Sequence, residues 1–208
     1  KFLSHIRECD AIIQVVRCFD DSNITHVDGS VDPARDVETI NYELIFADLA
    51  TVEKQLTRAE KLIKTGDKKY KTEVELFARI REWLEAGNPV SAMEMTEEEK
   101  QLSHDLFLLT AKPTIYVANI AEDDIGQDAD ALPLVAQLRD YVARFGADVL
   151  TVSAKVEDEL AQLPDDERDL FIEELGIGES GMSKLIKKSY DLLGLISYLT
   201  AGPKEVRA

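Results

Sequence analysis

The chain has 208 residues and a formal net charge of -17, because 41 acidic residues outnumber 24 basic ones. Hydrophobic residues make up 45% of the sequence, which is typical of a globular protein and excludes a disordered one. The negative charge argues against DNA or an anionic membrane as the main partner, since both require Lys and Arg to neutralise phosphates. Cys9 and Cys18 follow neither zinc-site nor redox-motif spacing. The cysteine usage favours a reducing, cytoplasmic compartment. We also expect a monomer.

Three short apolar runs predict buried strands, at residues 11–19, 114–120 and 147–154. A helical pattern at 132–145 separates the second run from the third. A strand, a helix and a strand at this spacing form a βαβ unit, which requires parallel pairing. The sequence therefore predicts an α/β protein with a parallel sheet.

More than ninety residues with a helical pattern separate the first two strands. Apolar residues recur there at alternating steps of four and three, in two runs separated by Gly66-Asp67. The first run contains Ile45, Leu49, Val52, Leu56, Ala59 and Ile63, and the second contains Tyr70, Val74, Phe77, Arg81 and Leu84. The spacing predicts an antiparallel coiled-coil hairpin inserted into the α/β domain.

Further helix signals follow the hairpin. Gly87 with Asn88 and Pro89 ends the second helix, and Thr96 before three glutamates predicts the N-cap of a helix to about Leu109. Two more helices are expected to begin near Asp165 and Gly181. The run at 196–202 predicts a final strand. The chain begins at Lys1 and ends at Ala208 beside this run, so both ends look like cuts in a longer protein.

Polar segments follow the second and third predicted strands, at 119–122 (Asn-Ile-Ala-Glu) and 153–155 (Ser-Ala-Lys). In open α/β sheets, ligands bind outside the carboxyl ends of the strands. An Asn amide carries a donor and an acceptor that match a purine edge. The pair predicts a base-binding edge, although an Asn after a strand is also an ordinary turn former.

Basic residues gather at the turn of the predicted hairpin, opposed there only by Glu60 and Asp67. They are Lys54, Arg58, Lys61, Lys64, Lys68, Lys69 and Lys71. This reversal of sign favours contact with RNA or an acidic partner, and a solvated tip of helix-forming lysines is the alternative. The acidic clusters at 97–99, 122–124 and 157–159 have adjacent rather than ligand-spaced residues, so no metal site is predicted.

Four stretches resemble the YchF family of Obg-related P-loop nucleotidases, the Obg-like ATPases: residues 1–19, 20–54, 112–123 and 198–208. The resemblance extends over the whole chain and implies a partial P-loop G-domain with an inserted helical coiled coil. It places G-domain parts at 1–34 and 111–197, the insertion at 35–110 and the start of a TGS domain at 198–208.

The resemblance also implies roles for individual residues. The intact protein would bind and hydrolyse ATP or GTP with Mg2+ and associate with the ribosome. The family's Asn-x-x-Glu motif accepts ATP, because the usual Asp that selects guanine is absent. Asn119, Ile120 and Glu122 would read the base, with Ser153 and Ala154 closing over it. His26 would position the attacking water, and Lys61, Lys64, Lys68 and Lys69 would contact the ribosome or RNA.

The 208 residues depart from the family pattern in one respect. They contain no G-x-x-x-x-G-K-[ST] loop, and the Asp-x-x-Gly segment that the family places before the first of these strands is missing. We therefore expect this chain alone to bind nucleotide poorly or not at all. The competing interpretation is a non-catalytic interaction module that uses only the basic hairpin.

Overall fold

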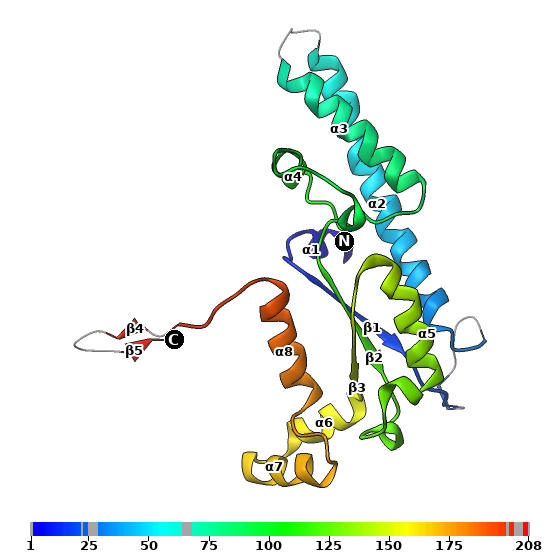
Figure 1. The fold of residues 1–208 in the computed structure, drawn as a ribbon, viewed down its shortest axis with the longest axis vertical. Coiled ribbons are helices and arrows are strands. Elements are labelled where there is room, and N and C mark those ends of the chain that lie inside the picture. The colour runs from blue at the N-terminus through cyan, green and yellow to red at the C-terminus, as the bar shows by residue number, and fades with distance from the viewer. Residues whose placement is uncertain are drawn as a thin grey trace.

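The computed structural model describes residues 2–21, 23–24, 29–63, 68–198, 200–201 and 206–207. Its centre is a parallel sheet in the order β1-β2-β3 (Figure 1). The strands are β1 (Ile12–Arg17), β2 (Thr114–Asn119) and β3 (Val149–Val152). All three predicted strands and their parallel pairing are confirmed. The register sets Asn119 beside Val152, so β2 and β3 end together.

Helices pack on both faces of the sheet. The first turns of α2 (Pro33–Leu62) and the helix α5 (Pro133–Val142) pack on one face. The core there contains Val16, Val37, Tyr116, Ala118, Val135, Leu138, Val142 and Val149. On the opposite face, α8 (Gly181–Leu192) contacts β3, whereas Ile13 and Val15 of β1 are exposed (Figure 1). This division follows from the pleat, since alternate strand residues point to opposite faces.

The hairpin consists of α2 and α3 (Lys68–Glu85), which project together from the sheet (Figure 1). Asp32 caps α2 by accepting the Arg35 N–H at 3.2 Å, and Pro33 occupies the first turn. The buried seam contains Ile45, Val52, Leu56, Ala59, Leu76, Phe77, Ile80 and Leu84. The predicted hairpin is confirmed.

One position of the predicted seam is wrong. Ile80 is buried in the second helix where the four-three rhythm placed Arg81. Arg81 instead lies beside Glu85, at 3.5 Å on the surface of the helix. The apolar side chain therefore takes the buried position, and the charged one keeps its contact with water.

The helix α4 (Glu97–His104) begins as predicted and ends early. Thr96 Oγ1 accepts the Glu99 N–H at 3.2 Å, and the Glu99 carboxylate accepts the Thr96 N–H at 2.9 Å. The expected end at Leu109 is wrong because the N–H groups of Leu109 and Thr110 bind Asp48 rather than earlier carbonyls. Phe107, with φ of 48°, also leaves the helical conformation.

The remaining elements are shorter helices and 3-10 turns. They are α1 (Phe2–Arg7), α6 (Ala154–Gln162), α7 (Asp165–Glu174), and 3-10 helices at Val90–Ala92, Glu122–Asp124, Ala129–Ala131 and Ala143–Phe145. The helices predicted near Asp165 and Gly181 are confirmed. Within the described ranges, no helix has the length and apolar character needed to cross a membrane. Cys9 and Cys18 are free thiols.

Within the described residues, the predicted strand at 196–202 is confirmed only in part. Residues 195–198 have no regular structure, and Ile196 and Tyr198 are 82% and 73% exposed. Only β4 (Thr200–Ala201) is a strand, paired with β5 (Val206–Arg207). Alternating apolar residues indicated a strand, but a strand also needs a neighbour for its backbone groups.

Candidate functional site

The two polar segments at the carboxyl ends of β2 and β3 lie side by side. Asn119 Oδ1 accepts a hydrogen bond from the Ala154 N–H at 2.9 Å. This bond joins the last residue of one strand to the first turn of α6, 35 positions later in the chain. We call the surface formed by Asn119, Glu122, Ser153, Ala154 and Lys155 the base edge.

A charge pair lies at the rim of the base edge. Lys155 Nζ forms an ion pair with Glu122 Oε2, and the two side chains are 63% and 41% exposed. The bond to Glu122 is the main reason why the pKa of Lys155 is raised above its usual value. Lys155 therefore stays charged at neutral pH, and both side chains are accessible to solvent. The sequence interpretation included Glu122 as a base reader and did not assign Lys155.

Ile120 and Ser153, also predicted to contact the base, are both buried. The Ile120 side chain belongs to the core, and its N–H donates to the Val152 carbonyl at 2.9 Å. Only the Ile120 carbonyl is left for a ligand. Ser153 Oγ finds no hydrogen-bond partner in the described part of the chain. It lines a cavity of about 320 Å3 together with Thr151.

The helix that carries Ala154 and Lys155 is fixed by a contact that sequence reasoning missed. The Glu157 carboxylate accepts the N–H groups of Gly181 at 2.6 Å and Met182 at 3.1 Å. A carboxylate at a helix N-terminus satisfies donors without an intrahelical partner. A Cβ at Gly181 would lie 2.9 Å from the Val152 methyl groups, so this position needs glycine for close approach. In the sequence, Glu157 shows only as the first residue of the acidic cluster at 157–159.

The other predicted site residues can be placed only in part. His26 and Lys64 lie outside the described residues. Lys68 begins α3, and its side chain is likewise not described. Lys61 and Lys69 are exposed on the two helices of the hairpin.

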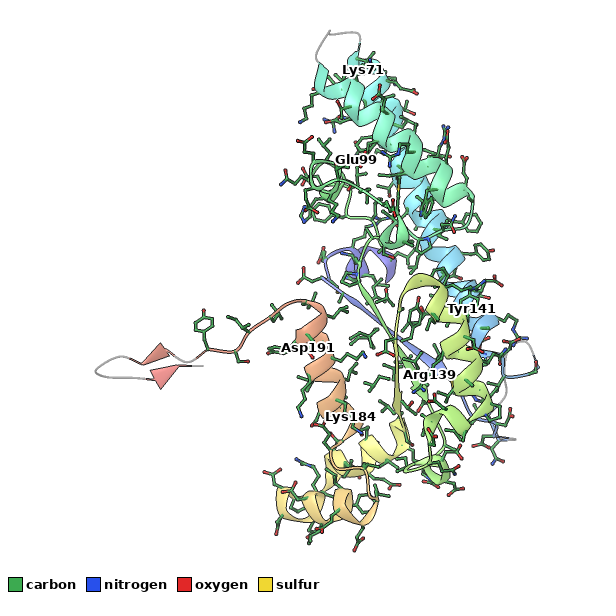
Figure 2. All side chains as sticks on the ribbon, in the orientation of Figure 1. Lys71, Glu99, Arg139, Tyr141, Lys184 and Asp191 are labelled. Atoms are coloured by element: carbon green, nitrogen blue, oxygen red, sulfur yellow. The ribbon has the colours of Figure 1, made fainter. Side chains whose placement is uncertain are left out.

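The structure divides the predicted basic tip into two groups. On α3, Lys69 and Lys71 pair with Glu73 and Glu75 at 3.6 and 3.9 Å, and Figure 2 shows Lys71 near the tip. On α2, Lys54, Arg58 and Lys61 follow one another at helical spacing around a shallow surface depression. Within the resolved ranges of the hairpin, these three side chains form no ion pair. We call Lys54, Arg58 and Lys61 the basic stripe.

A buried carboxylate joins the hairpin to the rest of the chain. Asp48 is 0% exposed and accepts the N–H groups of Leu109 at 2.9 Å and Thr110 at 2.8 Å, with the Thr110 hydroxyl at 2.9 Å. Burial raises the pKa of Asp48, although the Thr110 and Leu109 N–H groups act in the opposite direction.

Arg7 completes this junction. Its guanidinium lies 3.4 Å from Asp48 and donates to the Phe107 carbonyl at 2.8 Å and to Thr51 Oγ1 at 3.0 Å. The junction therefore fastens α1, α2 and the loop after α4 to one another. The sequence does hint at this junction, because Asp48 is an acidic residue three positions after Ile45 on the buried side of α2.

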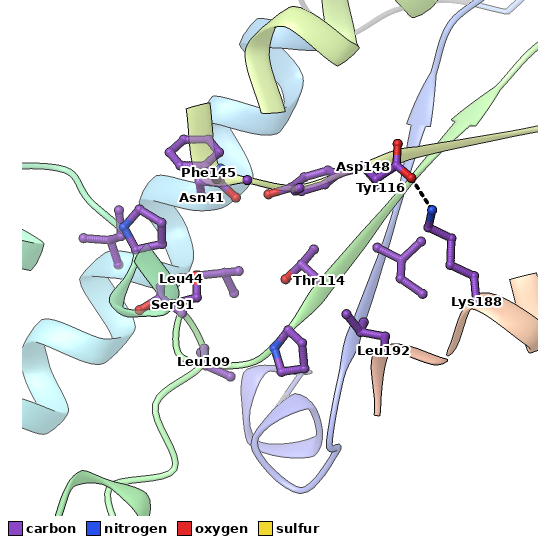
Figure 3. A pocket seen from close by; sticks show the side chains of 17 residues that line it. Asn41, Leu44, Ser91, Leu109, Thr114, Tyr116, Phe145, Asp148, Lys188 and Leu192 are labelled. Atoms are coloured by element: carbon purple, nitrogen blue, oxygen red, sulfur yellow. Dashed lines mark hydrogen bonds and ion pairs between the residues drawn. The ribbon is translucent and has the colours of Figure 1, made fainter. Parts of the chain in front are cut away.

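A second cavity lies at the opposite end of the sheet. It has a volume of about 280 Å3 and includes Thr114, the first residue of β2. Figure 3 shows Tyr116 and Phe145 at this cavity, with the ion pair of Asp148 and Lys188 beside them. Because Asn119 ends the same strand, this cavity is separate from the base edge. Nowhere in the described ranges do three or more His, Cys, Asp or Glu side chains form a group that could hold a metal ion.

Comparisons with known proteins give consistent matches over the whole chain. It is 52% identical to the ribosome-binding ATPase YchF of Bacillus subtilis over 208 residues and 44% identical to that of Escherichia coli O157:H7. It is 38% identical to the Obg-like ATPase 1 of Saccharomyces cerevisiae over 213 residues, or 99% of the chain and 53% of the relative. No family model matches.

A solved structure extends these matches to the fold. The YchF GTPase of Schizosaccharomyces pombe superposes with a TM-score of 0.85 at 33% identity, over 99% of this chain and 56% of that one. All of the present chain matches the two bacterial relatives, but it spans only 57% and 56% of their lengths.

Proposed function

This chain belongs to the YchF family of Obg-like ATPases, and on that premise we propose that its base edge binds the base of ATP or GTP in a ribosome-binding nucleotidase. The observation that carries the proposal is the hydrogen bond from the Ala154 N–H to Asn119 Oδ1. It brings the two segments predicted to surround the base into contact at the carboxyl end of a parallel sheet, where such folds bind ligands.

The free polar groups of the base edge suit a purine. With Asn119 Oδ1 engaged, its amide NH2 is free to donate to a ring nitrogen. The Ser153 hydroxyl is buried and without a partner within the described structure, so a base would reach it only through the cavity of about 320 Å3 that it lines. Glu122 lies at the rim, and Ile120 contributes its carbonyl. The hydrogen bonds of Glu157 to the start of α8 hold this arrangement in place before a ligand arrives.

For hydrolysis, we assign the positioning of the attacking water to His26, because an imidazole can orient or deprotonate a water beside a γ-phosphate. The 208 residues hold no G-x-x-x-x-G-K-[ST] loop, so phosphate binding is assigned to residues outside them. Mg2+ binds through one or two side chains and the phosphates of its nucleotide, so its binding is likewise assigned to residues outside this chain. No step assigned to this chain therefore passes through a metal.

The chain divides into parts of three domains, and one of them carries the contact with the ribosome. We assign residues 1–34 and 111–197 to the nucleotide domain, 35–110 to the insertion and 198–208 to the start of a TGS domain, in a cytoplasmic monomer. The ribosome or RNA contact belongs to the hairpin. Its basic stripe carries three cations without intramolecular partners in the described residues, as expected of groups that neutralise phosphates.

The test of the base edge uses a hybrid protein in which the 208 residues replace the matching segment of the Bacillus subtilis relative. Asn119→Ala should weaken ATP and GTP binding at least about tenfold, since it removes the donor and frees the Ser153-Ala154 turn. Asn88→Ala, in the turn after α3, is the matched control and should bind like the unmodified hybrid. Unchanged affinity in Asn119→Ala would refute the base edge.

A second variant separates binding from hydrolysis. His26→Ala should keep ATP affinity while lowering the hydrolysis rate, because the residue is assigned to water and not to the base. Equal hydrolysis rates in the two proteins would remove His26 from the mechanism.

The alternative function, a non-catalytic module acting through the hairpin, is tested by ribosome sedimentation. Neutralising the basic stripe (Lys54→Gln, Arg58→Gln, Lys61→Gln) should weaken association and reduce its salt dependence. Neutralising the already paired Lys69 and Lys71 should have a smaller effect. Lost association with intact ATP hydrolysis would assign docking alone to the hairpin. A hybrid that binds ribosomes and no nucleotide would favour the module.

A further inference from the structure

We propose that Lys155 is a specificity-determining residue that biases the base edge toward adenine nucleotides, by binding the carboxylate of Glu122 that guanine would need. The inference rests on the proposed function, because it concerns the same base. It adds a residue that the Asn-x-x-Glu motif does not contain.

The first step concerns the guanine oxygen. Guanine presents O6 as an acceptor, so a site that selects it needs a donor at that position. The Ala154 N–H lies at the correct edge of the sheet for such a donor, but it is bonded to Asn119 Oδ1 at 2.9 Å. Guanine would have to break this bond. An adenine, with an amino group in place of O6, does not need the donor.

The second step concerns the two guanine donors. The N1–H and N2–H2 groups of guanine are read by a carboxylate that accepts with both of its oxygens. Lys155 binds Glu122 Oε2, so a ligand would have to share that oxygen with the ammonium or displace it. A two-oxygen contact with guanine therefore weakens or opens the ion pair. Adenine carries no N1–H, and it loses nothing when Oε2 is occupied.

Other acidic residues around Lys155 also favour its charged form. Besides Glu122, the nearby acids Glu159 and Asp123 also raise the pKa of Lys155. The ammonium is therefore charged throughout the neutral range, and the pair persists. Because both side chains are largely exposed, the pair adds little to folding stability. A change at Lys155 should therefore alter selectivity without unfolding the chain.

The test measures ATP and GTP dissociation constants in the hybrid protein. Lys155→Met keeps the length of the side chain and releases Glu122. GTP affinity should rise relative to ATP affinity by about three- to tenfold, the effect of exchanging an exposed ion pair for hydrogen bonds to a free carboxylate. Lys187→Met is the matched control and should leave the ratio unchanged. It removes a lysine of α8 that is paired with Glu179.

A double variant identifies the mechanism. Lys155→Met combined with Glu122→Gln should lose the gain for GTP, because the released carboxylate no longer exists. An unchanged ratio in Lys155→Met, or a gain that survives Glu122→Gln, would overturn the inference. If the unmodified hybrid binds neither nucleotide, the proposed function itself fails. Nucleotide binding with an unaltered ratio refutes only the role of Lys155.

Discussion

Two carboxylates, each beside a basic side chain, have opposite surroundings in this molecule. Asp48, at the base of the hairpin, is fully buried and accepts hydrogen bonds from Leu109, Thr110 and Arg7. Glu122, at the base edge, is 41% exposed and pairs with Lys155. The two carboxylates therefore have different roles, one in stability and one at the surface that faces a ligand. A buried carboxylate must be fully satisfied and stabilises one structure, whereas an exposed ion pair adds little to folding stability and leaves its carboxylate within reach of a ligand.

The largest effect is expected at Asp48. Asp48→Ala leaves the Leu109 and Thr110 N–H groups buried without an acceptor, and should lower the free energy of unfolding by about 3–5 kcal/mol. Urea unfolding of the 208-residue chain measures this. Asp48→Asn retains an acceptor oxygen and should lose less. A loss below about 1 kcal/mol in Asp48→Ala would show that the junction is not a centre of stability.

A smaller loss is expected at Gly181. Its Cβ would lie 2.9 Å from the Val152 methyl groups, so Gly181→Ala should cost about 1–3 kcal/mol through overpacking. Adding Val152→Ala removes those methyl groups, and the two changes should then be less destabilising together than the sum of their separate effects. Strict additivity in denaturant unfolding would contradict close packing of α8 on β3.

The pH dependence distinguishes the two carboxylates further. Burial raises the folded-state pKa of Asp48 above its ordinary value of 3.8. The folded chain therefore binds this proton more tightly than the unfolded chain, and the stability from the protonated form is lost as pH rises through the folded pKa. Asp48→Asn has no such proton. The stability of the unaltered chain relative to Asp48→Asn should fall as the pH rises above about 4, and a constant or rising difference would contradict the raised pKa.

The smallest effect is expected at Glu122. Because its ion pair is exposed, Glu122→Gln should change the free energy of unfolding by less than about 0.5 kcal/mol. The same urea titration measures this, with Asp48→Asn as the contrasting variant. A loss as large as that of Asp48→Asn would mean that Glu122 is structural, and the contrast between the two carboxylates would not hold.

Local patterns accounted for much of the fold. The strands, the hairpin and the caps at Asp32 and Thr96 follow from hydrophobic spacing and from side chains that bond their own backbone. The end of α4 could not be predicted, because Asp48, more than sixty residues away, binds the N–H groups of Leu109 and Thr110. Tertiary contacts of this kind leave no signal in a short window.

For the base edge, too, the sequence predicted which segments lie together but not how their side chains pair. The proximity of Asn119 and Ala154 follows from the adjacency of their strands. The pairing of Lys155 with Glu122, and that of Glu157 with the start of α8, depends on how helices after the sheet are oriented. A charge count places these residues in acidic surface clusters, and only their positions in space show their partners.

Hydrogen–deuterium exchange of the hybrid protein, with and without ATP, tests most directly whether the base edge holds the nucleotide. We expect slower exchange at residues 119–122 and 153–157 when ATP is bound. Little change is expected at the Asp48 junction, because the Leu109 and Thr110 N–H groups there are already bonded and buried. Bound ATP that leaves residues 119–122 and 153–157 unprotected would contradict the assignment of the base edge.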